Sequence, residues 1–421
     1  MISSSPTSRP APLPLPGADN CVHCGFCLQA CPTYLALDDE NDSPRGRIVL
    51  MKAIAGGALD LDDADARLHL DRCLGCRACE TACPSGVPYG QLLELTRERG
   101  AERRGIPFVA RLVLSVFSSP LLLAIAMWKA RLLRASGIAA LLSRLPGRVG
   151  FAMAMLASTR RTRAESSRSY DPGGDGARGT VAALDGCVME GLFGPANRAT
   201  ERTLAANGYE LARAEGQRCC GALHLHAGDA SAARDLARVN IAAFERSGAE
   251  FVAVNSAGCG AAMKEYAHLL SGDPAWSDRA RAFSAKVRDV SELLAAAGPA
   301  AGGALPVKVA YDAPCHLLHA QRISSPPLAV LAAIPGLELV PLADSDQCCG
   351  SAGLYSLVEP AVSALVLAPK LASIAATGAP VVATGNPGCL MQIGAGLLRS
   401  GQAAQARHPV ELLDASYASR S

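Results

Sequence analysis

The chain of 421 residues has few aromatic side chains and almost no net charge. Aromatic residues make up 4% of it, and the formal net charge at pH 7 is +2. Such a balance gives no reason to expect a nucleic-acid partner, since nucleic acid attracts strongly basic surfaces. The length suggests about two to four domains.

The sequence also lacks the apolar core of a signal peptide and, in its apolar stretch 112–127, the length of a membrane span. Residues 1–18 are polar and rich in proline, so we expect a disordered tail there. The stretch 112–127 has sixteen residues, with Ser118, Ser119 and Pro120 in its middle. A membrane-spanning helix needs about twenty apolar residues.

Acidic residues are scarce around that apolar stretch. Residues 97–168 contain fourteen Lys or Arg but only three Asp or Glu. Two interpretations remain open for this region. It forms two short helices packed on the protein, or it forms an amphipathic basic platform that lies on anionic lipid or on a partner subunit.

Cysteine, by contrast, is abundant, with sixteen residues. Eight of them form two blocks of the same spacing, C-x2-C-x2-C-x3-C, each closed by Pro32 or Pro84. This run ligates [4Fe–4S] clusters in bacterial two-cluster ferredoxins. Structural zinc favours paired C-x2-C units, and a chain of this length buries a core without disulfides. Oxygen-sensitive clusters indicate a reducing cytoplasm.

In two-cluster ferredoxins the fourth cysteine of each block ligates the other block's cluster. That rule predicts two crossed ligand sets. They are Cys21, Cys24, Cys27 and Cys83 for cluster A, and Cys73, Cys76, Cys79 and Cys31 for cluster B. Arg45, Arg47 and Arg77 lie near these blocks in sequence, where they either raise the cluster potentials or are solvated at the surface.

The other eight cysteines repeat at offsets of 128 to 130 residues, which indicates an internal duplication. The first copy has Cys187, the pair Cys219-Cys220 before a glycine, and Cys259. The second copy has Cys315, the pair Cys348-Cys349 before a glycine, and Cys389.

Strand-like and helical segments alternate in the same order in both copies. Apolar runs at 181–184 and 307–311 precede the first cysteine of each copy, and helical segments follow at 197–206 and 327–333. Short runs precede the cysteine pairs, at 209–211 and 337–340. Long helices follow, at 231–246 and 361–376. Strands come last, at 251–254 and 380–384. This alternation predicts parallel α/β units.

We therefore predict a multidomain α+β and α/β protein. Its N-terminal part is a mainly helical two-[4Fe–4S] module, then comes a helical basic linker, and two duplicated parallel α/β domains follow. The predicted boundaries are a tail at 1–18, the cluster module at 19–100, the linker at 101–175, and cysteine-rich domains at 176–300 and 301–421.

The eight later cysteines follow the carboxyl ends of predicted strands and precede helices. Open α/β sheets place ligands at that edge, and helix N-termini there favour thiolates. These cysteines are a candidate third metal site, and the adjacent pairs allow either a cluster or a redox-active disulfide.

Several stretches resemble the iron–sulfur subunits of glycolate oxidase (glycolate dehydrogenase), from about Asp19 onward. The Cys-Cys-Gly repeats also resemble heterodisulfide reductase subunits. The most specific stretch is Gly-Asn-Pro-Gly-Cys-Leu-Met-Gln-Ile at 385–393; the others are residues 42–48, 311–316 and 347–353.

The resemblance implies an electron-transfer subunit in a complex whose FAD-bearing subunits oxidise glycolate to glyoxylate, and sometimes D-lactate to pyruvate. This chain would pass electrons toward a quinone or another membrane acceptor, without a catalytic site of its own. It would lie in the cytoplasm, peripherally on the inner face of the cytoplasmic membrane through residues 97–168.

One departure from the heterodisulfide reductase pattern concerns the end of each repeat. Those domains end in C-x2-C, whereas Ser256 and Asn386 replace the first cysteine here. This weakens the interpretation as a disulfide-reducing enzyme. The same architecture also resembles the cluster subunit of an anaerobic glycerol-3-phosphate dehydrogenase. The later cysteines could hold a cluster shared between the copies or remain bare thiols, and the whole chain could be a metal-stabilised scaffold.

Overall fold

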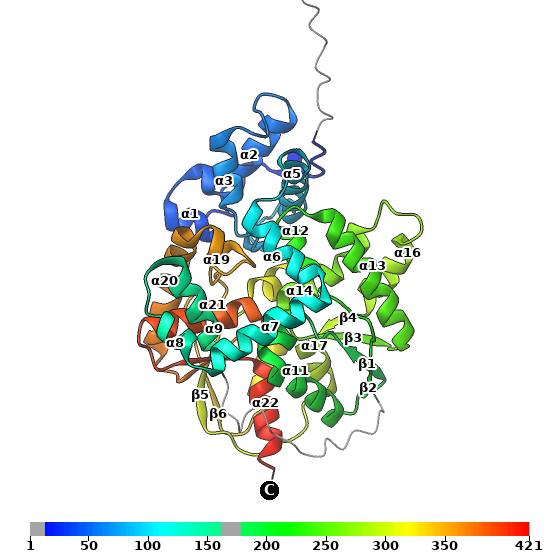
Figure 1. Ribbon diagram of the computed structural model, residues 1–421, viewed down its shortest axis with the longest axis vertical. Coiled ribbons are helices and arrows are strands. Elements are labelled where there is room, and N and C mark those ends of the chain that lie inside the picture. Colours follow the sequence, from blue (N-terminus) through cyan, green and yellow to red (C-terminus); the bar gives the residue numbers. More distant parts are fainter. Residues whose placement is uncertain (1–12, 161–177, 421) are drawn as a thin grey trace, which may run out of the picture.

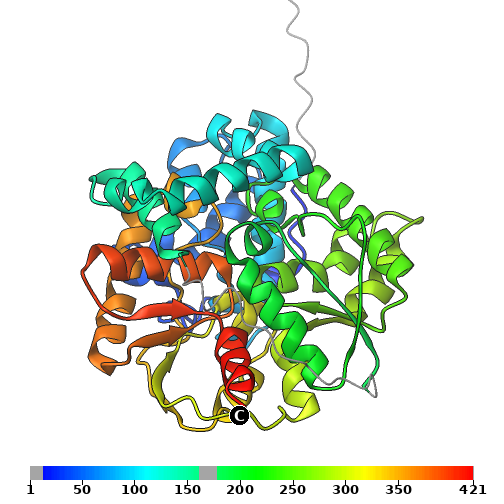
Figure 2. The ribbon, with the colours of Figure 1, turned by 60° about the horizontal axis from the view of Figure 1, so that its bottom comes forward.

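The computed structural model describes residues 13–160 and 178–420. A helical N-terminal region is followed by two parallel sheets covered by helices, which confirms the predicted fold class (Figures 1 and 2). Of the predicted tail, residues 1–12 lie outside the described residues, whereas Leu13 and Ala18 are buried. Residues 161–168 of the basic stretch also lie outside them.

Short helices joined by the cysteine loops make up the N-terminal module. Ser43 begins α2 because its side chain accepts a hydrogen bond from the Gly46 N–H, and Pro44 occupies the first turn, where no N–H is needed. The elements are η1 (Ala18–Asn20), α1 (Pro32–Leu37), η2 (Glu40–Asp42), α2 (Pro44–Ala55), α3 (Ala64–Asp71), α4 (Ala78–Thr81) and α5 (Tyr89–Arg104).

Between this module and the sheets, the described residues 105–160 form four helices, which lie across one face of the molecule (Figure 2). The first two meet at 107°, because Ser119 ends one and caps the next, which begins with Pro120. Two short helices are therefore present, as one of the two interpretations expects. They are α6 (Phe108–Ser118), α7 (Pro120–Ala135), α8 (Ile138–Leu142) and α9 (Gly147–Ser158).

The first sheet has the strand order β2-β1-β3-β4, all parallel. Val181 of the central strand pairs with Leu211 on one side and Phe251 on the other. The elements are β1 (Thr180–Ala183), α11 (Val188–Ala206), β2 (Glu210–Ala212), α12 (Ala222–His226), α13 (Ala230–Ser247), β3 (Phe251–Val254), α14 (Ala257–Lys264), α15 (Tyr266–Leu269), α16 (Ser277–Lys286), β4 (Val287–Asp289) and α17 (Val290–Ala297).

The second sheet repeats this topology in the order β6-β5-β7-β8. Val309 of its central strand pairs with Leu339 and Val381. The elements are β5 (Val307–Tyr311), η3 (His316–Ala320), α18 (Ser325–Ala332), β6 (Leu337–Val340), α19 (Tyr355–Val358), α20 (Pro360–Thr377), β7 (Val381–Ala383), α21 (Pro387–Arg399), β8 (Gln405–Arg407) and α22 (Pro409–Ala418).

The C-terminal helix α22 lies between the two sheets and joins them into one core (Figure 2). Val410 and Tyr417 of α22 belong to the same buried cluster as Val181 and Val309 of the two central strands. Helix α20 is long and apolar enough to cross a membrane, but its Lys370 is buried against Asp312 at 2.9 Å, beside the core of the second sheet.

The structure extends one predicted helix and contains two edge strands that the sequence did not predict. The predicted helix 197–206 begins earlier, at Val188, because the chain continues helically through Gly191, Gly194 and Pro195 with a kink at Phe193. Those residues disfavour a helix in isolation, so local propensity hides this part. The edge strands β4 and β8 have only three residues each and carry no alternating pattern long enough to read.

Candidate iron–sulfur sites

The structure gathers one predicted ligand set around a hollow at the surface of the N-terminal module. This hollow, site A, is lined by Cys21, Cys24, Cys27 and Cys83, and Cys79 of the other predicted set borders it as well. Cys24 is exposed, and Val22 and Phe26 on the same loop are each 68% exposed. Burial raises the pKa of the Cys27 thiol to about 11. The exposure of Cys24, Val22 and Phe26 shows that site A nevertheless opens toward solvent on this side.

The second predicted ligand set lines another hollow, site B, inside the protein. It contains Cys31, Cys73, Cys76 and Cys79, all buried. The Tyr89 hydroxyl donates to Cys73 Sγ at 3.5 Å, and the Gly75 N–H donates to the same sulfur at 3.4 Å. Cys31 therefore lies with the cysteines of the second block and Cys83 with those of the first, the placement that crossed ligand sets require.

The two cysteine loops have matching backbones despite different residues. His23 and Gly75 occupy the third position of their blocks, and both have positive φ, 55° and 64°. Gly25 and Arg77, the residues after the second cysteine, also have positive φ, 87° and 64°. Left-handed residues at both positions curl the loop so that its cysteines face one centre. Cys31 caps helix α1, whereas no helix follows Cys83 until Tyr89.

A fully buried arginine lies beside site B. Arg47 donates to Asp42 Oδ1 at 3.0 Å and approaches Cys31 Sγ at 4.0 Å. Arg45, by contrast, is partly exposed and pairs with Glu40, and Arg77 pairs with Glu80 and Glu265. Of the three arginines, Arg47 is the one buried against cluster ligands, and it places a positive charge where a reduced cluster gains negative charge.

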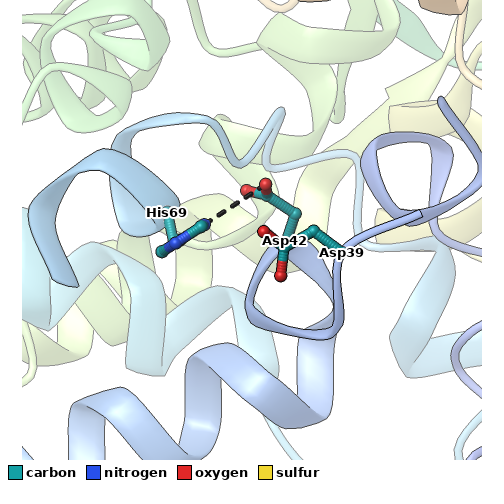
Figure 3. Close-up of side chains that lie close together, drawn as sticks. All are labelled: Asp39, Asp42 and His69. Atoms are coloured by element: carbon teal, nitrogen blue, oxygen red, sulfur yellow. Dashed lines mark ion pairs between the residues drawn. The ribbon is translucent and has the colours of Figure 1, made fainter. Parts of the chain in front are cut away.

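The carboxylate of Asp42 is shared among several partners. Figure 3 shows it near Asp39 and His69, with His69 Nδ1 at 3.2 Å. Three such side chains resemble a small metal site, but Arg47 and Arg72 also bind Asp42, each at 3.0 Å. Two guanidinium groups already balance the carboxylate, so this is an ion-pair network that fixes Arg47.

In the first cysteine-rich half, the cysteines gather at the carboxyl edge of the sheet. This group, site C, consists of Cys187, Cys219, Cys220 and Cys259. Hydrogen bonds from Cys187 and Cys220, together with one involving His224, hold the pKa of Cys219 well below its usual range. Nε2 of His224 lies 2.9 Å from the Ser118 hydroxyl of α6.

The second half repeats the arrangement as site D, which consists of Cys315, Cys348, Cys349 and Cys389. Cys315 and Cys348 are 3.9 Å apart, and Cys349 and Cys389 are 3.3 Å apart. Cys315, Cys349 and Cys76 donate hydrogen bonds to Cys348 and hold its pKa well below its usual range. In both halves, then, hydrogen bonds to the first cysteine of the pair favour its thiolate form, the form that ligates metals.

The eight later cysteines thus form two groups of four. Between them lie the residues that replace the first cysteine of each C-x2-C motif. Asn386 Oδ1 accepts from the Gly258 N–H at 3.2 Å and from the Ser256 hydroxyl at 3.4 Å. Two polar residues therefore meet across the halves where the heterodisulfide reductase pattern would bring two cysteines together.

The donor chemistry of sites A and B fits [4Fe–4S] clusters. Each site offers four thiols and no competing carboxylate ligand, and all sixteen cysteines of the chain are free. All-thiolate sets select soft metals and iron–sulfur clusters. Sites C and D offer four thiols each and fit the same chemistry.

The fold and these sites define an iron–sulfur protein that combines a two-cluster module with duplicated cysteine-rich α/β halves. Family models agree: the 4Fe-4S dicluster domain matches residues 17–87, and the cysteine-rich domain matches residues 181–264 and 309–394.

The chain belongs to the family of glycolate oxidase iron–sulfur subunits. It is 38% identical to the probable glycolate oxidase iron-sulfur subunit of Bacillus subtilis over 94% of this chain and 93% of the relative. It is 34% identical to the glycolate oxidase iron-sulfur subunit of Escherichia coli over the same shares. Lactate utilization protein A of an Exiguobacterium species is 32% identical over 56% of this chain and 96% of that protein. The chain is therefore an iron–sulfur subunit of an oxidoreductase complex, in which catalysis takes place on other subunits.

Sequence reasoning missed one residue and one contact beside the sites. His224 follows Cys219 by five residues, so it returns to the cysteine on the first turns of α12. A histidine at that spacing after a Cys-Cys-Gly could therefore have been predicted from the sequence to lie near the cysteine. The contact of Cys76 with Cys348 has no signal, because it depends on how the module docks on the second half.

Proposed function

We propose that this chain is the electron-transfer subunit of a flavin-dependent glycolate (2-hydroxy acid) dehydrogenase complex. It relays electrons from FAD-bearing subunits to a membrane acceptor, a quinone or another one, while glycolate is oxidised to glyoxylate. The observation that carries the proposal is the placement of the two ferredoxin-type sites. Site A opens to solvent, whereas site B is buried against the second cysteine-rich half, so the two form a path from the surface inward.

The residues have separate tasks in this relay. Cys21, Cys24, Cys27 and Cys83 hold cluster A, and Cys73, Cys76, Cys79 and Cys31 hold cluster B. Clusters supply one-electron carriers, which divide the two-electron oxidation of a flavin into single steps. The protein fixes their spacing and surrounds site B with buried polar donors, among them Tyr89 and Arg47.

The exposed loop of site A fits the docking of a flavin subunit. Val22 and Phe26 stand in solvent on either side of Cys24. Exposed apolar side chains beside a redox centre are typical of a protein-binding surface. A flavin subunit that covered this loop would bring its flavin next to cluster A.

The helices α6–α9 fit a peripheral contact with the inner face of the cytoplasmic membrane. Their exposed apolar residues define an apolar surface, consisting of Phe108, Leu112, Leu121, Leu122, Ile125, Trp128, Leu132, Ile138, Leu141, Leu145 and Val149. Residues 103–164 contain eleven Lys or Arg and no Asp or Glu. Apolar side chains with basic neighbours are typical of surfaces that lie on anionic lipid.

Vesicle flotation tests this membrane contact. The full chain is mixed with vesicles of phosphatidylethanolamine and phosphatidylglycerol at low salt. The double variant Leu121→Gln/Trp128→Gln should bind much less than the wild type, whereas Leu328→Gln, an exposed leucine on α18, should bind normally. Equal flotation of all three proteins would refute the contact.

Co-purification followed by dye reduction tests the function. The anaerobically purified complex is expected to contain FAD subunits and to reduce a dye with glycolate. D-lactate is the second candidate, favoured by the similarity to lactate utilization protein A. Reduction with glycerol-3-phosphate alone, or reduction of a disulfide by the isolated chain, would overturn the proposal.

A further inference from the structure

A cavity of about 530 Å³ lies where the N-terminal module, α6 and both cysteine-rich halves meet. Figure 1 shows α5, α6, α12 and α19 in this region. The volume is in the range of sites for small organic ligands, which run from about 300 to 1,000 Å³. The cavity is distinct from the hollows at sites A and B.

One wall of the cavity belongs to site B. Cys73 and Leu74, from the loop that holds cluster B, line it directly. Arg97 holds this wall in place: its guanidinium donates to the carbonyl oxygen of Cys73 at 2.7 Å and to that of His226 at 3.3 Å. A molecule in the cavity would therefore be in contact with a cluster loop, close enough for direct electron transfer.

The duplication supplies matching residues to the cavity. His226 and Tyr355 each lie seven residues after the first cysteine of the Cys-Cys-Gly motif in their half, and both line the cavity. The Tyr355 hydroxyl donates to the Arg72 carbonyl at 2.7 Å. The tyrosine therefore contributes its apolar ring to the cavity lining and not its hydroxyl. Imidazole and guanidinium groups are suited to hydrogen-bond a carbonyl oxygen.

We take the side of the cavity beside the start of α6, where the apolar surface of α6–α9 begins, as its mouth. Ile106, Pro107 and Phe108 border it, and the Phe108 side chain extends into solvent at the start of that surface. A ligand with a redox-active polar head and a long apolar tail would match both ends, with its head in the cavity and its tail along α6.

We propose that this cavity binds the headgroup of a membrane quinone and is the place where electrons leave the chain. The proposal rests on the relay function, which supplies the electrons. A quinone accepts two electrons, one after the other through site B, and takes up two protons from water at the cavity mouth to become a quinol. The reductant is the flavin on the partner subunit.

Filling the cavity tests the proposal. Ala227 lies on the cavity wall at the end of α12 and is half-buried, so Ala227→Phe reduces the space for a ring. Ala55→Phe, at the half-buried end of α2 and outside the cavity, is the matched control. Phe108→Gln, at an exposed position of the mouth, is a second variant with little risk to folding.

The clusters of the purified complex are reduced with dithionite, and their reoxidation by a short-tailed benzoquinone is followed by absorbance. We expect Ala227→Phe to slow this reoxidation at least about tenfold and Phe108→Gln to raise the quinone concentration required. Reoxidation by ferricyanide and the cluster EPR signals should not change, and Ala55→Phe should behave like the wild type.

A binding readout accompanies the kinetics. A photoreactive azidoquinone should label residues 105–110 or 223–227 of the wild type and lose this label in Ala227→Phe. The proposal is overturned by unchanged reoxidation and labelling in Ala227→Phe, by labelling confined to a partner subunit, or by loss of the FAD subunits from Ala227→Phe, which would make the cavity a docking surface. Because dithionite replaces glycolate, failure of the proposed function is seen separately, in the dye assay.

Discussion

The side chains of Cys76 and Cys348 are in hydrogen-bond contact, although 271 residues lie between them. The first belongs to site B and the second to site D. Two further contacts hold the same interface: Tyr355 donates to the Arg72 carbonyl at 2.7 Å, and Thr81 lies 2.5 Å from Nδ1 of His319. The N-terminal module therefore docks with its buried cluster site directly on the second cysteine-rich half.

This contact predicts that the cysteines of the second half influence cluster B more strongly than those of the first half. Cys348→Ser replaces a thiolate by a neutral hydroxyl next to Cys76, so the midpoint potential of cluster B should rise. Cys219→Ser makes the same change in site C and should leave that potential nearly unchanged. Redox titration followed by EPR measures both, and equal shifts in the two variants would contradict the asymmetric docking.

The crossing of the fourth cysteines predicts which cluster each variant loses. Cys83→Ser should remove about four irons per chain and give the EPR spectrum of Cys24→Ser, since both cysteines line site A. Cys31→Ser should instead match Cys76→Ser, which lies in site B. If Cys83→Ser resembled Cys76→Ser, the ligands would be uncrossed and the assignment wrong.

The buried Arg47–Asp42 pair predicts a large loss of stability when one partner is removed. Arg47→Met leaves the buried Asp42 carboxylate with Arg72 and removes the bonds of Arg47 to the His69 carbonyl and to Thr33, so it should cost about 3 kcal/mol of unfolding free energy, the lower end for a broken buried pair. Arg45→Met breaks the partly exposed pair with Glu40 and should cost about 1 kcal/mol or less. Anaerobic denaturant titration compares them, and similar midpoints would argue against a structural role for Arg47.

Glu94 predicts a pH dependence of stability at the junction of the module with the cysteine-rich halves. Burial and the nearby Glu265 raise its pKa to about 7, against the opposing effect of Arg77 and Arg97. The pKa of Glu94 in the folded protein exceeds its unfolded value of 4.5. The contribution of protonated Glu94 to the unfolding free energy is therefore complete below about pH 4.5 and is lost as the pH rises to about 7.

Glu94→Gln should remove this loss, which amounts to at most about 3 kcal/mol. Thermal unfolding at about pH 5.5 and about pH 8 measures it. The wild type should lose more stability than Glu94→Gln over this interval. Glu98→Gln, one turn along α5 and paired with Arg234, serves as the control and should keep the wild-type pH dependence. A wild type with the same pH profile as Glu94→Gln would disprove the prediction.

Much of the fold could be predicted from the sequence, because the spacing of the cysteines and the repeated pattern of strands and helices are both visible along the chain. The C-x2-C-x2-C-x3-C-P blocks fix loop size, and the structure brings Cys83 to Cys21 and Cys31 to Cys73 as that spacing predicts. The order of strands and helices in each half followed from repeated patterns, since a buried parallel strand is a short apolar run.

The rest depended on contacts between distant segments. Arg47 could not be distinguished from Arg45 by sequence, because its burial requires α2 to pack against α3 and Cys31. Two separate groups of four cysteines could not be distinguished from one shared site, since that depends on how the halves are placed about α22. The cavity between α5, α6, α12 and α19 likewise requires all three parts of the chain.

The most direct test of the relay is rapid freeze-quench EPR of the purified complex after it is mixed with glycolate. The account predicts that the signals of both reduced clusters appear at least as fast as turnover, and that Cys24→Ser leaves the flavin reduced while quinone reduction stops. Clusters that stay oxidised while the complex reduces quinone at its full rate would contradict it.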